Sequence, residues 1–74
     1  MNENTRREID FGVFLVHRLA DHWKRSAADS YGVLSSTGIM DGYIIPFYDV
    51  LHTQGEEALV EDITELARKR GAQV

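Results

Sequence analysis

The chain has 74 residues, a formal net charge of −4, no cysteine and only 9% aromatic residues. This length predicts a single domain, residues 1–74, with a thin hydrophobic core. The missing cysteines exclude disulfides and thiolate metal sites, and the acidic balance makes general affinity for nucleic acid unlikely on physical grounds, because such affinity depends on neutralising phosphates. The polar stretch MNENTRREID has no signal-peptide pattern and no apolar run is long enough to span a membrane, so we expect a cytoplasmic protein.

The first predicted helix extends from Thr5 to Arg25. Thr5 and Glu8 have the spacing of a capping box, which marks a helix start. Gly12 is unfavourable inside a helix and indicates a close approach to a second helix. Apolar residues recur at helical steps and predict one buried stripe, made of Ile9, Val13, Val16, Ala20 and Trp23. The stripe is widened by Phe11, Phe14, Leu15 and Leu19.

A second, shorter helix is expected between Ser26 and Gly38. Ser26 is a favourable N-cap residue, and Gly38 suits the left-handed conformation that often ends a helix. The spacing of the apolar residues predicts an inward face made of Ala28, Tyr31 and Leu34.

The segment from Ile39 to His52 is apolar enough to be the central element, and it contains the single proline of the chain. Pro46 lacks a backbone donor and clashes with the preceding turn, but proline is well tolerated at the first position of a helix. We therefore expect a break before Phe47; the alternative is one helix that is kinked at Pro46. After the break, a shared buried face is expected for Phe47, Val50 and Leu51.

The last predicted helix, Glu56 to Arg70, has the clearest amphipathic pattern. Its apolar stripe contains Leu59, Val60, Ile63, Leu66 and Ala67. Thr53 and Glu56 again have capping-box spacing, acids occupy the first turn and basic residues the last turn, and Gly71 closes the helix. Together these segments predict an all-α domain of about four short helices with tight connections.

Residues that could support catalysis or bind a metal are sparse. His17 and Asp21 are four residues apart and could share a helix face, but two ligands do not make a metal site. Ser35 and Ser36 have no neighbouring base in sequence, and the chain has no glycine-rich phosphate loop. We therefore expect a non-enzymatic protein with neither metal nor other cofactor.

The segment around His52 has both a structural and a functional interpretation. In the structural one, His52 contacts the last carbonyls of one helix and Thr53 caps the next. In the functional one, the exposed polar groups of this corner bind a partner. The candidate binding residues are Tyr48, His52, Gln54, Glu56, Glu57 and Glu61.

Four aromatic residues gather toward the middle of the sequence. They are Tyr31, Tyr43, Phe47 and Tyr48. A place in the core is the first expectation, because these side chains are largely apolar. The alternative is a protein-binding surface, if Tyr43 and Tyr48 prove exposed on one face with Ile44 or Ile45, because tyrosine combines an apolar ring with a polar tip.

The stretch YDVLHTQGEEALVEDI, from Tyr48 to Ile63, resembles a family of small bacterial proteins called DUF3791, as do the upstream stretches FGVFLVHRLADHW and GIMDGYI. Its signature is L-H-T-Q-G-E-E followed by V-E-D-I. The chain departs from the family pattern at Pro46, where members carry a more regular helix. No catalytic residues are attributed to the family. The resemblance implies a stand-alone protein encoded beside one that resembles an ADP-ribosyltransferase toxin, and hence an antitoxin-like partner.

The leading hypothesis is therefore a protein-binding module that covers a basic nucleotide-binding cleft of the co-encoded enzyme. The acids available for this are Glu56, Glu57, Glu61 and Asp62. The alternative is a small helix-turn-helix-like DNA-binding autoregulator, although residues 26–38 contain no Lys or Arg. A small enzyme centred on His52 is a third hypothesis, and a homo-oligomer is compatible with all three.

Overall fold

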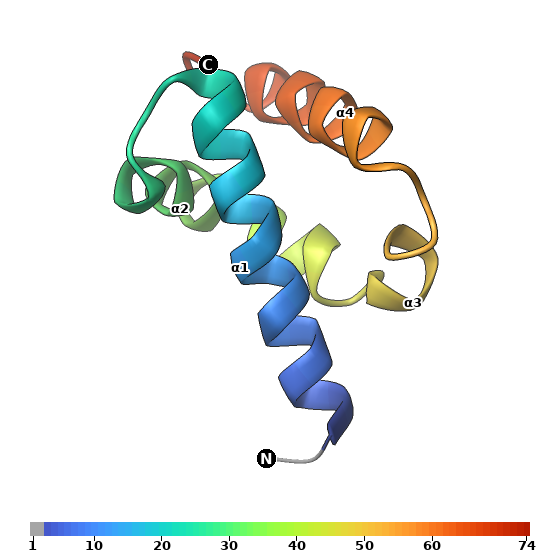
Figure 1. Cartoon of the computed structure of the whole chain (residues 1–74). Helices are drawn as coiled ribbons and strands as arrows, with labels where there is room; N and C mark the ends of the chain where they lie inside the picture. The colour runs from blue at the N-terminus through green and yellow to red at the C-terminus, as the bar shows by residue number, and fades with distance from the viewer. Residues whose placement is uncertain (1–2) are drawn as a thin grey trace.

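In a computed structural model that describes residues 3–74, the helices are arranged around one long N-terminal helix (Figure 1). In chain order they are α1 (Glu3–Trp23), α2 (Ala27–Ser36), η1 (Met40–Ile44), α3 (Tyr48–Leu51) and α4 (Glu56–Lys69). The described residues contain no strand, so the all-α prediction is confirmed, with five helical elements instead of about four. Met1 and Asn2, from the polar N-terminal stretch, lie outside the described residues. Within residues 3–74, no helix is both long enough and apolar enough to cross a bilayer.

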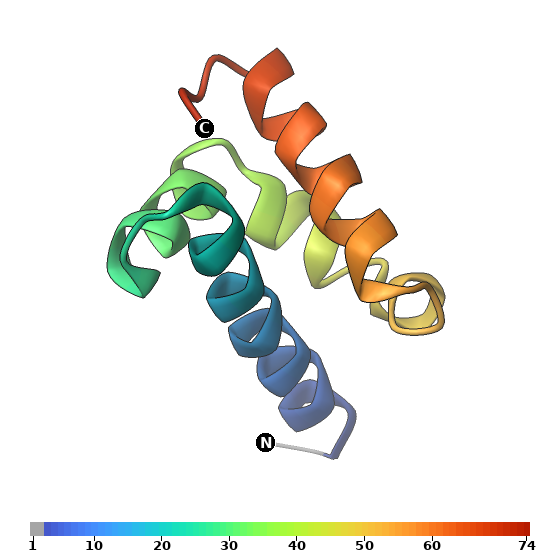
Figure 2. The same cartoon turned by 45° about the horizontal axis from the view of Figure 1, so that its top comes forward.

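The other helices pack mainly along the C-terminal part of α1. α2 lies on one side of α1 and α4 on the other, and the N-terminal end of α1 extends beyond them (Figures 1 and 2). η1 is a single π-helical turn that approaches α1 at Gly12 and leads, through a turn, into the short α3. All five elements contribute to one core of buried apolar side chains, namely Leu15, Val16, Leu19, Leu34, Ile39, Met40, Ile44, Leu51, Leu59, Val60, Ile63 and Ala67.

The buried face of α1 is only part of the predicted, widened stripe. Its buried apolar residues are Leu15, Val16, Leu19 and Ala20. Ile9 and Val13, which we expected in the stripe, are 43% and 51% exposed. The prediction was wrong for these two residues because α1 carries apolar side chains on two sides, and the other helices cover only one side of its N-terminal half.

Three of the predicted helix-end signals are confirmed. The Ser26 hydroxyl accepts a hydrogen bond from the backbone N–H of Asp29 at 3.0 Å and caps α2. Gly38 and Gly71 follow α2 and α4 with φ values of +75° and +94°. These left-handed conformations are strained for other residues, so both glycines end their helices as the sequence predicts.

Both predicted capping boxes are wrong. Thr5 lies inside α1, which is already helical at Glu3. The N-cap of α4 is Gly55, which makes no side-chain cap hydrogen bond. The Thr53 hydroxyl instead donates to the carbonyl of Val50 at 2.8 Å. A threonine hydroxyl can donate to a backbone carbonyl earlier in the chain or accept from a backbone N–H later in the chain. Thr53 does the former, at the C-terminal end of α3.

The chain breaks at Pro46, as expected, but the proline is not the first residue of the next helix, which starts at Tyr48. η1 ends before the proline, a turn includes Pro46 and Phe47, and α3 starts directly after that turn. Leu51 is 2% exposed, but Phe47 and Val50, which we expected beside it in the core, are 50% and 57% exposed. Phe47 lies in the turn before α3 and packs against the Tyr43 ring. Val50 points about 100° away from Leu51 around the helix, so only Leu51 reaches the core.

The inward face of α2 also differs from the prediction. Leu34 is fully buried as expected, whereas Ala28 and Tyr31 are exposed. Ser30 is fully buried in their place, and its hydroxyl has no hydrogen-bond partner among the described residues. The spacing from Ser30 to Leu34 is one helical turn, so a small polar residue occupies the core position that periodicity assigned to larger ones.

α4 matches its prediction most closely. Four of the five predicted stripe residues are buried and Leu66 is half-buried. The indole N–H of Trp23 donates to the Thr64 hydroxyl at 2.9 Å, and that hydroxyl donates to the Val60 carbonyl at 2.6 Å. This partly buried chain of hydrogen bonds fixes the end of α1 against the middle of α4.

Candidate functional site

The α3–α4 corner, residues 48–56, contains four of the six predicted binding residues. His52 is the C-cap of α3, and its Nδ1 lies 2.8 Å from the carbonyl oxygen of Tyr48. The imidazole also stacks on the Tyr48 ring, with ring centroids 4.6 Å apart and planes at 14°. The structural interpretation of His52 as a helix-end residue is therefore confirmed.

Tyr48 connects the corner to α1. Its ring makes an edge-on contact with Phe11, with centroids 5.3 Å apart and planes at 72°, which is a favourable arrangement for two aromatic rings. The Tyr48 ring thus lies between the rings of Phe11 and His52. Phe11 is half-buried and His52 is exposed. This contact sets the position of α3 against α1.

The other two corner residues are exposed. The backbone N–H of Gln54 donates to the carbonyl of Leu51 at 3.0 Å, and its side chain faces solvent. The Glu56 carboxylate lies 3.6 Å from Nε of Arg18, and both side chains are about half exposed. The corner therefore directs the polar side-chain atoms of His52, Thr53 and Glu56 to contacts within the chain.

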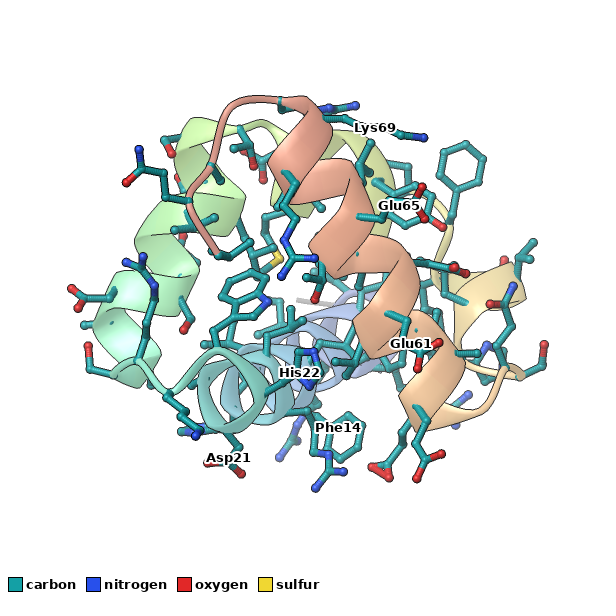
Figure 3. All side chains as sticks on the ribbon, turned by 90° about the horizontal axis from the view of Figure 1, so that it is seen from above. Phe14, Asp21, His22, Glu61, Glu65 and Lys69 are labelled. Carbon is teal, nitrogen blue, oxygen red and sulfur yellow. The ribbon has the colours of Figure 1, made fainter. Side chains whose placement is uncertain are left out.

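Glu57 and Glu61 lie on a different surface, the polar groove between α1 and α4. This groove has a volume of about 400 Å³, and His22 and Asp21 of α1 line it opposite the glutamates. In Figure 3 His22 points toward the α4 segment that carries Glu61. No group of three or more acidic or histidine side chains in the described structure is arranged to hold a metal ion.

A second groove is largely apolar and runs along the N-terminal half of α1. It has a volume of about 290 Å³. We call it the apolar groove; its lining residues are Thr5, Glu8, Ile9, Gly12, Val13, Val16, Tyr31, Met40, Asp41 and Ile45. These residues come from α1, α2 and the η1 segment, so three elements that are separate in the sequence form one concave surface.

Large apolar side chains are exposed along the apolar groove. Tyr31 is 54% exposed, which is comparable to Ile9 and Val13 across the groove from it. A single exposed apolar residue is ordinary, but several that line one concavity mark an interaction surface. Tyr31 therefore belongs to this exposed surface. Tyr43 and Tyr48, which the alternative interpretation placed on a binding surface, are half-buried, and Ile44 is fully buried, so the structure does not bear out that alternative.

Gly12 shapes the floor of the apolar groove. A Cβ at this position would lie 3.3 Å from the sulfur of Met40, closer than most such contacts. The predicted close approach at Gly12 is confirmed, with η1 as the approaching element. Sequence reasoning missed the groove because it assigned Ile9 and Val13 to the core, although the excess of apolar residues on two sides of α1 was a usable signal.

A comparison with known protein families identifies the family of this chain. Residues 10–70 match the model of a family described as protein of unknown function (DUF3791). No curated protein and no solved structure matches the chain. The matched range includes the α3–α4 corner and most of the residues that line the apolar groove.

Proposed function

This chain belongs to the DUF3791 family, as its sequence predicted, and we propose that it acts as a non-enzymatic protein-binding module. The apolar groove carries the proposal, because Ile9, Val13 and Tyr31 are each about half exposed on its walls. Burying apolar surface is worth roughly 25 cal/mol per Å². A partner that covers these side chains would therefore gain binding free energy from apolar surface that the fold leaves exposed.

A protein fits this surface better than a small molecule does. The volume of about 290 Å³ lies at the lower limit of cavities that bind small ligands, roughly 300–1,000 Å³. The groove runs along the outside of α1, so it cannot enclose a ligand on most sides. Extended contact with a partner surface would cover the same residues completely.

The partner we propose is the toxin-like enzyme that the family resemblance implies, an enzyme resembling an ADP-ribosyltransferase. In this proposal the chain is its antitoxin-like partner in the cytoplasm. Glu57, Glu61 and Asp62 are exposed on α4 and form no ion pair with another described residue. They could face a basic nucleotide-binding cleft, where complementary charge speeds association and selects partners.

The DNA-binding alternative has less support from the positions of the basic residues. α2 carries no Lys or Arg. A guanidinium N–H of Arg25 donates to the Gln73 carbonyl, and one of Arg70 donates to the Thr37 carbonyl at 2.8 Å. Contact of these arginines with phosphates would compete with hydrogen bonds that tie the last residues and α4 to the rest of the fold.

Co-expression with the neighbouring gene product tests the proposal. We expect the two proteins to co-purify and the enzyme to lose its toxicity. The His52→Ala variant is a control that should still bind and neutralise the neighbour. The His52 side chain is exposed at the corner and lies outside the apolar groove. The proposal fails if the folded protein neither binds nor neutralises the neighbour, and salt-sensitive binding to its own promoter in a mobility-shift assay would favour the alternative.

A further inference from the structure

We infer that the apolar groove binds one amphipathic helix of its partner, with apolar residues at positions i, i+4 and i+7 and with Lys or Arg beside them. The inference rests on the proposed function, since it names the kind of segment that the same surface would accept. Its evidence is the length of the groove, the elements that form its walls and the charge of its lining.

The length of the groove suits a helix. The α1 residues that line it extend from Thr5 to Val16, which corresponds to about three turns or ~16 Å along the axis. A partner helix laid along α1 presents one apolar stripe over the same distance. Tyr31 of α2 and Ile45 beside η1 form walls of the groove.

An extended peptide suits the groove less well. The described residues contain no strand whose edge could pair with one. The backbone groups of α1 and α2 are hydrogen-bonded within their helices, so an extended segment would leave its own N–H and C=O groups unpaired on the apolar lining. A helix satisfies these groups internally, which is the basis of helix-in-groove recognition.

The charge of the groove lining determines which charged residues the partner helix should carry beside its apolar stripe. The charged residues on the groove are Glu8 of α1 and Asp41 of η1, and both are acidic. Neither forms an ion pair with another described residue. Arg6 and Arg7 are close in sequence but do not line the groove. Lys or Arg on the incoming helix would therefore meet carboxylates, whereas Asp or Glu would meet charges of the same sign.

A second copy of this chain is a poorer occupant for the same reason. In a twofold dimer the same patch lies on both sides of the interface. Pairing two apolar grooves would bring Glu8 and Asp41 of one copy toward those of the other. A partner with basic flanks has the complementary charge that this arrangement lacks.

Selection from a display library of random 15-residue peptides tests the inference. The wild-type protein is the target, and Val13→Asp is the counter-target that removes groove-independent binders. We expect selected peptides with apolar residues at i, i+4 and i+7 and an excess of Lys and Arg. Their affinity should fall about tenfold or more on Val13→Asp and stay within about twofold on Phe14→Asp. Phe14 is 42% exposed on α1 but does not line the groove, which makes it the matched control.

The double variant Glu8→Lys/Asp41→Lys tests the charge. Selection against it should yield acidic flanks in place of basic ones, and circular dichroism with thermal melting verifies that each variant is folded. The inference is overturned if no groove-dependent peptides appear, if they are proline-rich or extended, or if the preference for charge does not change. It is also overturned if the wild type is a dimer that Val13→Asp dissociates, because a second copy then occupies the groove.

The two proposals fail in different ways. If the co-encoded enzyme binds and Val13→Asp leaves its affinity unchanged, the groove inference is wrong and the protein-binding function stands. If groove-dependent basic helices are selected and the enzyme does not bind, the inference stands and the proposed partner is wrong.

Discussion

The α3–α4 corner and the apolar groove are both exposed, but their side chains are used differently. At the corner, His52, Thr53 and Glu56 direct polar atoms toward their own chain. Along the groove, Val13 and Tyr31 remain about half exposed and no described element covers them. A distinctive polar motif can thus be mainly structural, whereas residues that a helical pattern assigns to the core can form the binding surface.

That the corner residues bind a partner is still a prediction. Experiments can test it separately from binding in the apolar groove. Gln54 at the corner, and Glu57 and Glu61 on the polar groove, have exposed side chains that a partner could contact. Substitutions at the corner should change stability more than binding, and substitutions in the groove should do the opposite. The expected effects on stability, from largest to smallest, provide the first test of this difference.

Tyr48→Ala should have the largest effect on stability, a loss of about 2 kcal/mol in the free energy of unfolding. The value is below that for a fully buried aromatic residue, because Tyr48 is partly exposed. The variant loses the ring contacts to Phe11 and His52 together. Urea denaturation measures the change.

The groove counterpart of this variant is Ile9→Ala. Because Ile9 is already 43% exposed, its truncation should cost less than about 1 kcal/mol in the free protein. Equal losses for the two variants would contradict the distinction between a structural corner and an uncovered groove.

His52→Ala should have an intermediate effect of about 1 kcal/mol. It removes the contact of Nδ1 with the Tyr48 carbonyl and the stacking on the Tyr48 ring, each worth about 0.5 kcal/mol at an exposed site. The folded variant should still bind and neutralise the partner, as measured by co-purification and by growth of cells that express the enzyme. Loss of function in a fully folded His52→Ala protein would revive the hypothesis that His52 is an active residue.

Glu56→Gln should have the smallest effect, below about 0.5 kcal/mol. The pair with Arg18 is about half exposed, and surface ion pairs of this kind contribute little and are screened by salt. Thermal melting at low and high salt measures it, with Arg18→Gln as the matched control. A loss above about 1 kcal/mol that persists at high salt would mean that this pair is essential to the corner.

Much of the fold could be predicted because several elements carry agreeing local signals. α4 combines an apolar stripe, an acidic first turn, a basic last turn and Gly71, and all of these point to the same helix. Ser26 and Pro46 likewise fix a helix start and a chain break through their own backbone chemistry. Family membership was also predicted, from a resemblance over nearly the whole chain, and residues 10–70 match the family model.

The remaining errors concern which side of a helix its neighbours cover. Periodicity finds the apolar residues of α1 but cannot choose between Leu15 and Val13, since that choice depends on where η1 and α2 pack. η1 approaches at Gly12 and α2 packs through Ser30, two small residues that hydrophobic patterns underrate. For this reason the sequence revealed the corner but not the apolar groove.

The most direct test of the account compares the affinity of the purified partner for two variants in one titration experiment. Val13→Asp should weaken binding about tenfold or more, or ~1.4 kcal/mol, because it places a charge in the apolar groove. The corner double variant His52→Ala/Gln54→Ala should bind within about twofold of wild type. A tenfold loss for the corner variant, with wild-type affinity for Val13→Asp, would contradict the assignment of binding to the groove.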